Sequence, residues 1–160
     1  MEVDVVIDVG CATHGTEESV NRLISMFHPK TLYGFDPHCR DTVDDVDGTL
    51  VILTRAAAWT YDGNVWFGDD ASRSRVTGAK GDRTVRCVDL AQLISEYRQQ
   101  HPNVVLKLDA EGAEYTLLPH LISTGTDRLL QEVWVEWHSP TDARERLEQE
   151  LACEVKAWTW

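Results

Sequence analysis

Basic residues are scarce in this chain of 160 residues, where 15 Lys and Arg face 27 Asp and Glu and the formal net charge is −12. Proteins that bind nucleic acid need basic side chains to neutralise its phosphates, so we expect no DNA or RNA partner. Closely spaced cysteines are missing too. None of the four cysteines belongs to a CxxC pair, and we therefore expect reduced thiols and no zinc finger.

Long apolar runs are also missing, since the longest are only of strand length and the first four residues include Glu2 and Asp4. The sequence predicts neither a membrane span nor a signal peptide, and we expect a cytoplasmic protein without a membrane partner. No repeat or low-complexity stretch interrupts the chain. With 42% apolar residues and six tryptophans, residues 1–160 are expected to form one domain.

The first 36 residues follow the order strand, glycine loop, helix, strand. Residues 3–15 read as a buried strand that enters a loop containing Gly10 and Gly15, and a short strand ends at Asp36. The residues between them have the apolar spacing of a helix (Val20, Leu23, Ile24, Phe27). This order is typical of a mononucleotide-binding half-fold, whose second acid binds ribose hydroxyls. Because the loop is not GxGxxG, it favours an adenosine-type ligand over a dinucleotide; a purely structural tight turn would look the same.

Three carboxylates, Asp109, Glu111 and Glu114, follow the apolar strand 104–108. In open α/β sheets, ligands bind outside the carboxyl ends of the strands, so these acids indicate a site. The strand 132–138 ends in His138, which is expected at the same rim. A solvated acidic turn remains an alternative for the three carboxylates.

The middle of the chain predicts shorter elements. We expect a strand at 50–54, a pair of strands at 65–68 and 84–87 extending the sheet edge, and a helix at 90–100 capped by Asp89. The segment 69–83 contains Arg73, Arg75, Lys80 and Arg83, and Arg86 follows it closely. This local excess of positive charge reads as a substrate lid or as a solvated loop.

Three further expectations concern the surface and the C-terminal third. An acidic stretch reads as a short helix or turn (Asp41, Asp44, Asp45, Asp47). The helix after Gly112 contains Pro119, which predicts a kink or a restart there. A helix at 141–151 and a strand at 154–160 complete the chain.

Taken in order, several of these segments resemble the FkbM-type family of S-adenosylmethionine-dependent methyltransferases. The most specific is Lys107-Leu-Asp-Ala-Glu-Gly-Ala-Glu114, which is similar to the family's K-x-D-x-E-G-x-E block; Asp8-Val-Gly10 is similar to its D-V-G opening. The resemblance implies an α/β fold of the Rossmann-like class I methyltransferase type. It implies a mostly parallel central sheet with helices on both faces and an antiparallel final hairpin. It also implies methyl transfer, usually to a hydroxyl oxygen.

The resemblance further assigns roles to individual residues. The cofactor S-adenosylmethionine would contact the glycine loop, the end of the second strand, Ala57 through its adenine, and Asp109. The loop residues are Asp8, Gly10, Cys11, Ala12 and Gly15, and the strand-end residues are Asp36 and Pro37. Glu111 and Glu114 would order the turn below Asp109. Glu136 and His138 would face the acceptor, with His138 as first and Asp109 as second candidate for the base that takes the hydroxyl proton.

Two features depart from the family pattern. The loop from Gly10 to Gly15 is one residue longer than D-V-G-A-N-x-G and lacks its asparagine, and little chain follows His138. Large cap elements over the acceptor would then be missing. An open site for a small hydroxylated or sugar-containing acceptor, or a site completed by a second copy in a homodimer, would follow.

The sequence leaves three alternatives to the methyltransferase. The chain could be a catalytically silent adenosine- or protein-binding module on the same fold. Alternatively, Asp109, Glu111, Glu114 and His138 could hold Mg or Mn for hydrolysis, although our main interpretation includes no metal. A nucleophilic Cys11 backed by His14 is the third.

Overall fold

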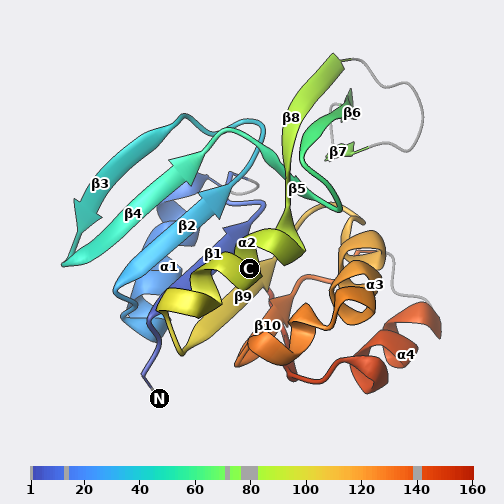
Figure 1. Cartoon of the computed structure of the whole chain (residues 1–160). Coiled ribbons are helices and arrows are strands. Elements are labelled where there is room, and N and C mark those ends of the chain that lie inside the picture. The colour runs from blue at the N-terminus through green and yellow to red at the C-terminus, as the bar shows by residue number, and fades with distance from the viewer. Residues whose placement is uncertain (1, 13–14, 71–72, 77–82, 139–141) are drawn as a thin grey trace.

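The computed structural model describes residues 2–12, 15–70, 73–76, 83–138 and 142–160. A seven-stranded sheet in the order β11-β10-β9-β1-β2-β4-β3 forms its centre (Figure 1). All neighbours in it are parallel except β3 and β4. The strands are β1 (Val5–Val9), β2 (Thr31–Phe35), β3 (Thr42–Val46), β4 (Thr49–Thr54), β9 (Val104–Leu108), β10 (Glu132–Val135) and β11 (Glu154–Ala157). The expected α/β class with a mostly parallel sheet is confirmed.

Helices cover both faces of this sheet, as expected. On one face, α1 (Thr16–Phe27) packs Val20, Leu23 and Ile24 against inward-facing residues of β1, β2, β4 and β9. The other face carries α2 (Leu90–Gln100), α3 (Glu114–Thr124) and α4 (Asp142–Glu150), whose leucines and isoleucine join the alternate residues of β1, β9 and β10. The central strands β1 and β9 are buried on both sides, which explains why their sequences are apolar apart from Asp8 and Lys107.

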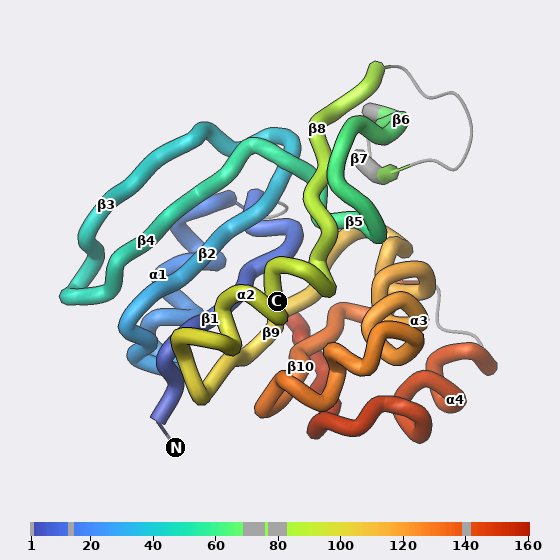
Figure 2. Tube along the Cα trace, in the orientation of Figure 1, coloured from blue at the N-terminus to red at the C-terminus, as the bar shows by residue number. Residues whose placement is uncertain are grey.

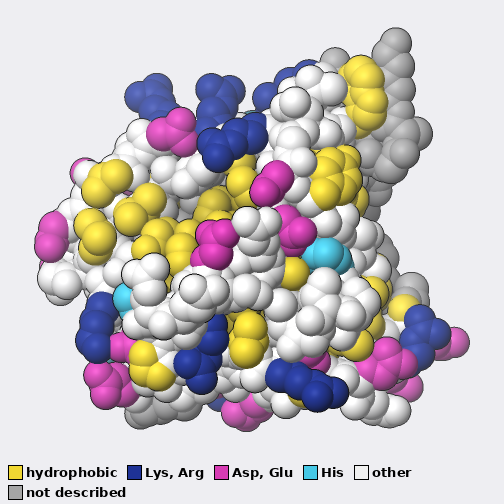
Figure 3. Space-filling view, in the orientation of Figure 1, with side chains coloured by type: hydrophobic (Ala, Val, Ile, Leu, Met, Phe, Trp, Pro, Cys, Tyr) yellow, Lys and Arg dark blue, Asp and Glu magenta, His cyan; other side chains and the backbone are white. Residues whose placement is uncertain are grey.

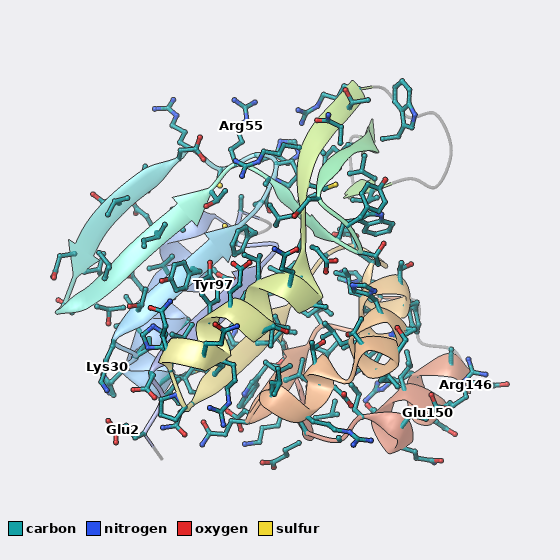
Figure 4. All side chains as sticks on the ribbon, in the orientation of Figure 1. Glu2, Lys30, Arg55, Tyr97, Arg146 and Glu150 are labelled. Atoms are coloured by element: carbon teal, nitrogen blue, oxygen red, sulfur yellow. The ribbon has the colours of Figure 1, made fainter. Side chains whose placement is uncertain are left out.

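Tyr97 shows how α2 is fixed to the sheet. Its ring stacks on that of Tyr33 in β2 with centroids 4.1 Å apart, and Figure 4 shows Tyr97 lying over the strands. The outer part of this face is not covered in the same way. Apolar side chains gather there over β3 and β4 in Figure 3. Two apolar residues of these strands, Val43 and Leu50, are 68% and 41% exposed.

The expected antiparallel final hairpin is wrong. The last strand, β11, pairs with β10 in parallel register, from Glu132 opposite Glu154 to Val135 opposite Ala157. The reason lies in α4, which connects the two strands as a crossover and returns the chain to the same end of the sheet. The antiparallel pair lies instead at the opposite edge, where the acidic stretch predicted as a helix or turn forms β3 against β4.

A second sheet of four strands stands away from β3 and β4 in Figure 2. Its order is β5-β8-β6-β7, and β6 pairs with β8 as expected from the sequence, in antiparallel direction. This sheet is separate from the main sheet instead of extending its edge. Its strands are β5 (Ala57–Trp59), β6 (Gly63–Asp70), β7 (Arg73–Val76) and β8 (Arg83–Asp89). Much of the predicted lid, including residues 71–72 and 77–82, lies outside the described residues.

Helix α3 runs through Pro119 as one element, so the expected restart does not occur. The helix ends at Gly125, whose left-handed backbone (φ 72°) is followed by the 3-10 turn Thr126–Leu129. Among the described residues, no helix is long and apolar enough to span a membrane.

The strand order creates a switch point beside β1. From β1 the chain proceeds to β2 and β4 on one side, and later from β9 to β10 and β11 on the other. Loops that follow β1 and β9 therefore diverge in opposite directions. In open α/β sheets, the crevice at such a point is where ligands bind.

Candidate functional site

A buried ion pair joins β1 and β9 directly below the switch point. Asp8 and Lys107 lie opposite each other in the parallel register, are both fully buried, and approach to 2.9 Å between Oδ1 and Nζ. Ser19 of α1 donates to the second Asp8 oxygen at 2.6 Å. Burial alone would lower the pKa of Lys107, but Asp8 and Asp109 together raise it, which keeps the ammonium charged.

The glycine loop is attached to this pair and to β2. Lys107 Nζ donates to the carbonyl of Gly10, whose φ of 79° is left-handed. The N–H of Ala12 donates to Asp36 Oδ2 at 3.1 Å, and the N–H of His38 donates to Oδ1 at 2.7 Å. Burial raises the pKa of Asp36 despite these two donors. The acid at the end of β2 thus fixes the shape of the loop after β1.

Cys11 is fully buried in this loop, and its thiol hydrogen-bonds to Cys39. That contact and burial raise the pKa of Cys11, so the thiol is protonated and poorly suited to nucleophilic attack. His14, the suggested base for such a nucleophile, lies outside the described residues. Gly15, with φ 102°, is the N-cap residue before α1.

Asp109, Glu136 and His138 come together at the carboxyl ends of β9 and β10; we call them the acid–imidazole cluster. One ligand atom from each lies within 4.8 Å of the others. Asp109 is fully buried, and its Oδ1 is 3.7 Å from Nε2 of His138. The backbone N–H of Glu136 continues the pairing of the two strands by donating to Leu108 at 2.9 Å.

Two further side chains orient this cluster. The indole N–H of Trp160 donates to Asp109 Oδ2 and Glu136 Oε2, both at 3.0 Å. Buried Glu114 accepts the backbone N–H of His138 at 2.6 Å, and the same oxygen is 3.3 Å from Nδ1. Nδ1 therefore faces Glu114, and Nε2 faces Asp109 and Glu111, the latter at 3.8 Å.

These contacts shift two pKa values. The contact with Glu114 raises the pKa of His138, and the negative charges of Glu111 and Asp109 add to that effect. Burial, followed by the proximity of Asp109, raises the pKa of Glu136. Both shifts mean that Glu136 and His138 hold a proton to higher pH than isolated side chains would.

The remaining predicted residues lie elsewhere. Pro37 is buried beside Asp36, and its carbonyl accepts from Arg55 Nε at 3.2 Å. The side chain of Ala57 packs in the core of the smaller sheet with Val65 and Phe67. A cavity of about 340 Å³ lies between that sheet and α2, and none of its lining residues belongs to the cluster or the glycine loop.

Two important residues were missing from the predicted site. Lys107 could have been found, because a lysine within the otherwise apolar strand Val104–Leu108 needs a buried acid as partner. Trp160 gave no such signal. Its contact with Asp109 spans 51 residues and exists only because the chain after β11 passes over the ends of β9 and β10.

No family model matches the chain, and no curated protein or solved structure is significantly similar to it.

Proposed function

We propose that this protein is an S-adenosylmethionine-dependent methyltransferase with a Rossmann-like class I fold, which methylates a hydroxyl of a sugar or another small metabolite. The observation that carries the proposal is the junction at the switch point. There the Ala12 N–H binds the Asp36 carboxylate, joining the glycine loop to the end of β2, while the acid–imidazole cluster occupies the ends of the next strands, β9 and β10. An adenosine-type donor and an acceptor hydroxyl are the ligands that this pair of features fits.

The residues suit distinct parts of the reaction. Asp36 would accept from the ribose hydroxyls with its remaining lone pairs, and the loop from Gly10 to Gly15 would enclose the methionine end of the donor. The bound donor supplies an electrophilic methyl group on a sulfonium, which the acceptor oxygen attacks as the carbon–sulfur bond breaks. The hydroxyl proton would go to the cluster, with His138 Nε2 as first acceptor because Glu114 faces Nδ1.

One observation favours a second function, that of a catalytically silent adenosine- or protein-binding module. Asp36 is only 6% exposed, and both of its oxygens already accept backbone N–H groups. In this alternative Asp36 shapes the loop, the adenosine pocket is retained, and the altered loop sequence no longer supports turnover.

Calorimetry with S-adenosylmethionine and its demethylated product tests the proposal. We expect saturable binding to the wild type. The affinity of Asp36→Ala should be lower by about tenfold or more, because hydrogen bonds to a charged group contribute about 1.5–3 kcal/mol. Asp36→Asn, which keeps one acceptor oxygen, should bind between the two. Asp44→Ala is the matched control, since Asp44 is exposed at the far edge of the sheet.

An acceptor screen over hydroxylated metabolites then separates the two functions. Methyl transfer that falls in His138→Ala while donor binding persists supports the enzyme. Donor binding without transfer to any hydroxylated acceptor supports the silent module, and no donor binding by the folded wild type contradicts both adenosine-based readings.

A further inference from the structure

The acid–imidazole cluster has the composition of a divalent-cation site. It presents two carboxylates and one imidazole from the ends of two neighbouring parallel strands, with one ligand atom of each within 4.8 Å of the others. Mixed oxygen and imidazole donors suit first-row transition ions. Because Asp109 is fully buried and Glu136 and His138 are only partly exposed, this is not a solvated acidic surface.

The distance between His138 Nε2 and Asp109 Oδ1 also fits an ion better than a hydrogen bond. At 3.7 Å it is too long for an N–H···O hydrogen bond. Two atoms that each lie about 2.1 Å from one ion are separated by roughly 3–3.5 Å. A closure of a few tenths of an ångström would therefore convert the present spacing into that of two ligands.

The surrounding contacts have the pattern seen behind metal ligands. Glu114 lies 3.3 Å from His138 Nδ1, which leaves Nε2 to face the cluster. Trp160 donates one N–H to Oδ2 of Asp109 and Oε2 of Glu136 and so fixes both carboxylates at one side. Such outer contacts orient the ligands and set the tautomer of the histidine.

The local charge also favours a bound cation. Asp109, Glu111, Glu114 and Glu136 place four carboxylates around one imidazole. The nearby ammonium of Lys107 is 2.9 Å from Asp8 and 3.6 Å from Asp109, so the same charge serves two acids. A divalent ion among the three ligands would add positive charge where these carboxylates converge.

We propose that Asp109, Glu136 and His138 bind one divalent transition-metal ion such as Mn²⁺. The role of the ion rests on the proposed function: it would bind the acceptor oxygen and stabilise it as the alkoxide that attacks the methyl group. His138 would then serve as a ligand, and the hydroxyl proton would leave to solvent. Ion binding itself does not depend on the methyl donor and can be measured without it.

The test uses the purified full chain, freed of metal with a chelator and titrated with Mn²⁺ in a calorimeter and by electron paramagnetic resonance. We expect one saturable Mn²⁺ site in the wild type. The Mn²⁺ affinity of Glu136→Gln and of His138→Gln should be lower than that of the wild type by about tenfold or more. Both substitutions are close in shape to the native side chains. Asp44→Asn should bind like the wild type, because it removes a carboxylate far from the cluster.

Thermal unfolding gives a second readout that does not depend on activity. Mn²⁺ should raise Tm of the wild type and of Asp44→Asn, because an ion that binds only the folded protein stabilises it against unfolding. Mn²⁺ should not raise Tm of Glu136→Gln, which lacks one of the three ligands. Circular dichroism checks that each variant folds. Absence of saturable binding in the wild type, or equal binding by Glu136→Gln and His138→Gln, overturns the inference.

Donor calorimetry on the metal-free protein keeps the two proposals apart. Donor binding without Mn²⁺ binding overturns the cation site and leaves the methyltransferase. Mn²⁺ binding that needs Glu136 and His138 without donor binding supports the cation site and contradicts the methyltransferase.

Discussion

Lys107→Met tests whether the buried pair below the switch point holds the site together. The variant keeps most of the side-chain volume but leaves the Asp8 carboxylate fully buried without its cation, with the Ser19 hydroxyl as its remaining hydrogen bond among the contacts described above. Removing one partner of a buried ion pair costs about 3–5 kcal/mol. For a chain of this length, that loss lowers Tm by roughly 6–20 °C.

The assay is urea unfolding followed by tryptophan fluorescence, with a double variant and a surface control. Asp8→Asn with Lys107→Met should recover about 1–3 kcal/mol relative to Lys107→Met alone, because no uncompensated charge remains. Arg146→Met should change the free energy of unfolding by only about 0.5 kcal/mol or less, since its partner Glu150 lies on the surface of α4 (Figure 4). A loss below about 1 kcal/mol for Lys107→Met, or no recovery in the double variant, would refute the charged pair.

Three smaller predictions concern other parts of the fold. Gly34→Ala should destabilise by about 1–3 kcal/mol in urea unfolding, because a Cβ there would lie 2.5 Å from Leu53 Cδ2; an unchanged midpoint would contradict the close packing. Asp89→Ala should lower the free energy of unfolding by about 1 kcal/mol, since the Asp89 carboxylate accepts two N–H groups at the start of α2. Asp89→Asn keeps a capping oxygen and should lose less, so equal losses in the two variants would argue against the cap. Lys30 lowers the pKa of Asp4, so the ion pair stabilises the fold above pH 3.8, and this stabilisation is lost as pH falls through the lower pKa of the folded state. The free energy of unfolding of Asp4→Asn, measured against pH, should lack this acid-dependent loss. A pH dependence identical to that of the wild type would contradict the pairing.

Much of the main sheet could be predicted, because its central strands carry a clear signal. Strands β1 and β9 are buried on both faces and appear as short apolar runs, and an acid or glycine marks the end of each. Parallel strands bring their carboxyl ends to one edge, so Asp36, Asp109 and His138 could be assigned to the same rim before the structure was known.

The errors occurred where long-range packing decides the outcome. The acids at 41–47 suggested a solvated turn, yet Asp44 and Asp45 are tolerated in β3 because an edge strand exposes them. The direction of β11 depends on α4 bringing the chain back across the sheet, which local sequence does not encode. Trp160 likewise reaches Asp109 only through the complete topology.

The central claim is tested most directly by calorimetric titration of S-adenosylmethionine into the wild type and Asp36→Ala. The proposed methyltransferase predicts saturable binding that Asp36→Ala weakens about tenfold or more while Asp44→Ala leaves it unchanged. No binding by the folded wild type, or equal binding by the wild type and Asp36→Ala, would contradict the assigned donor site.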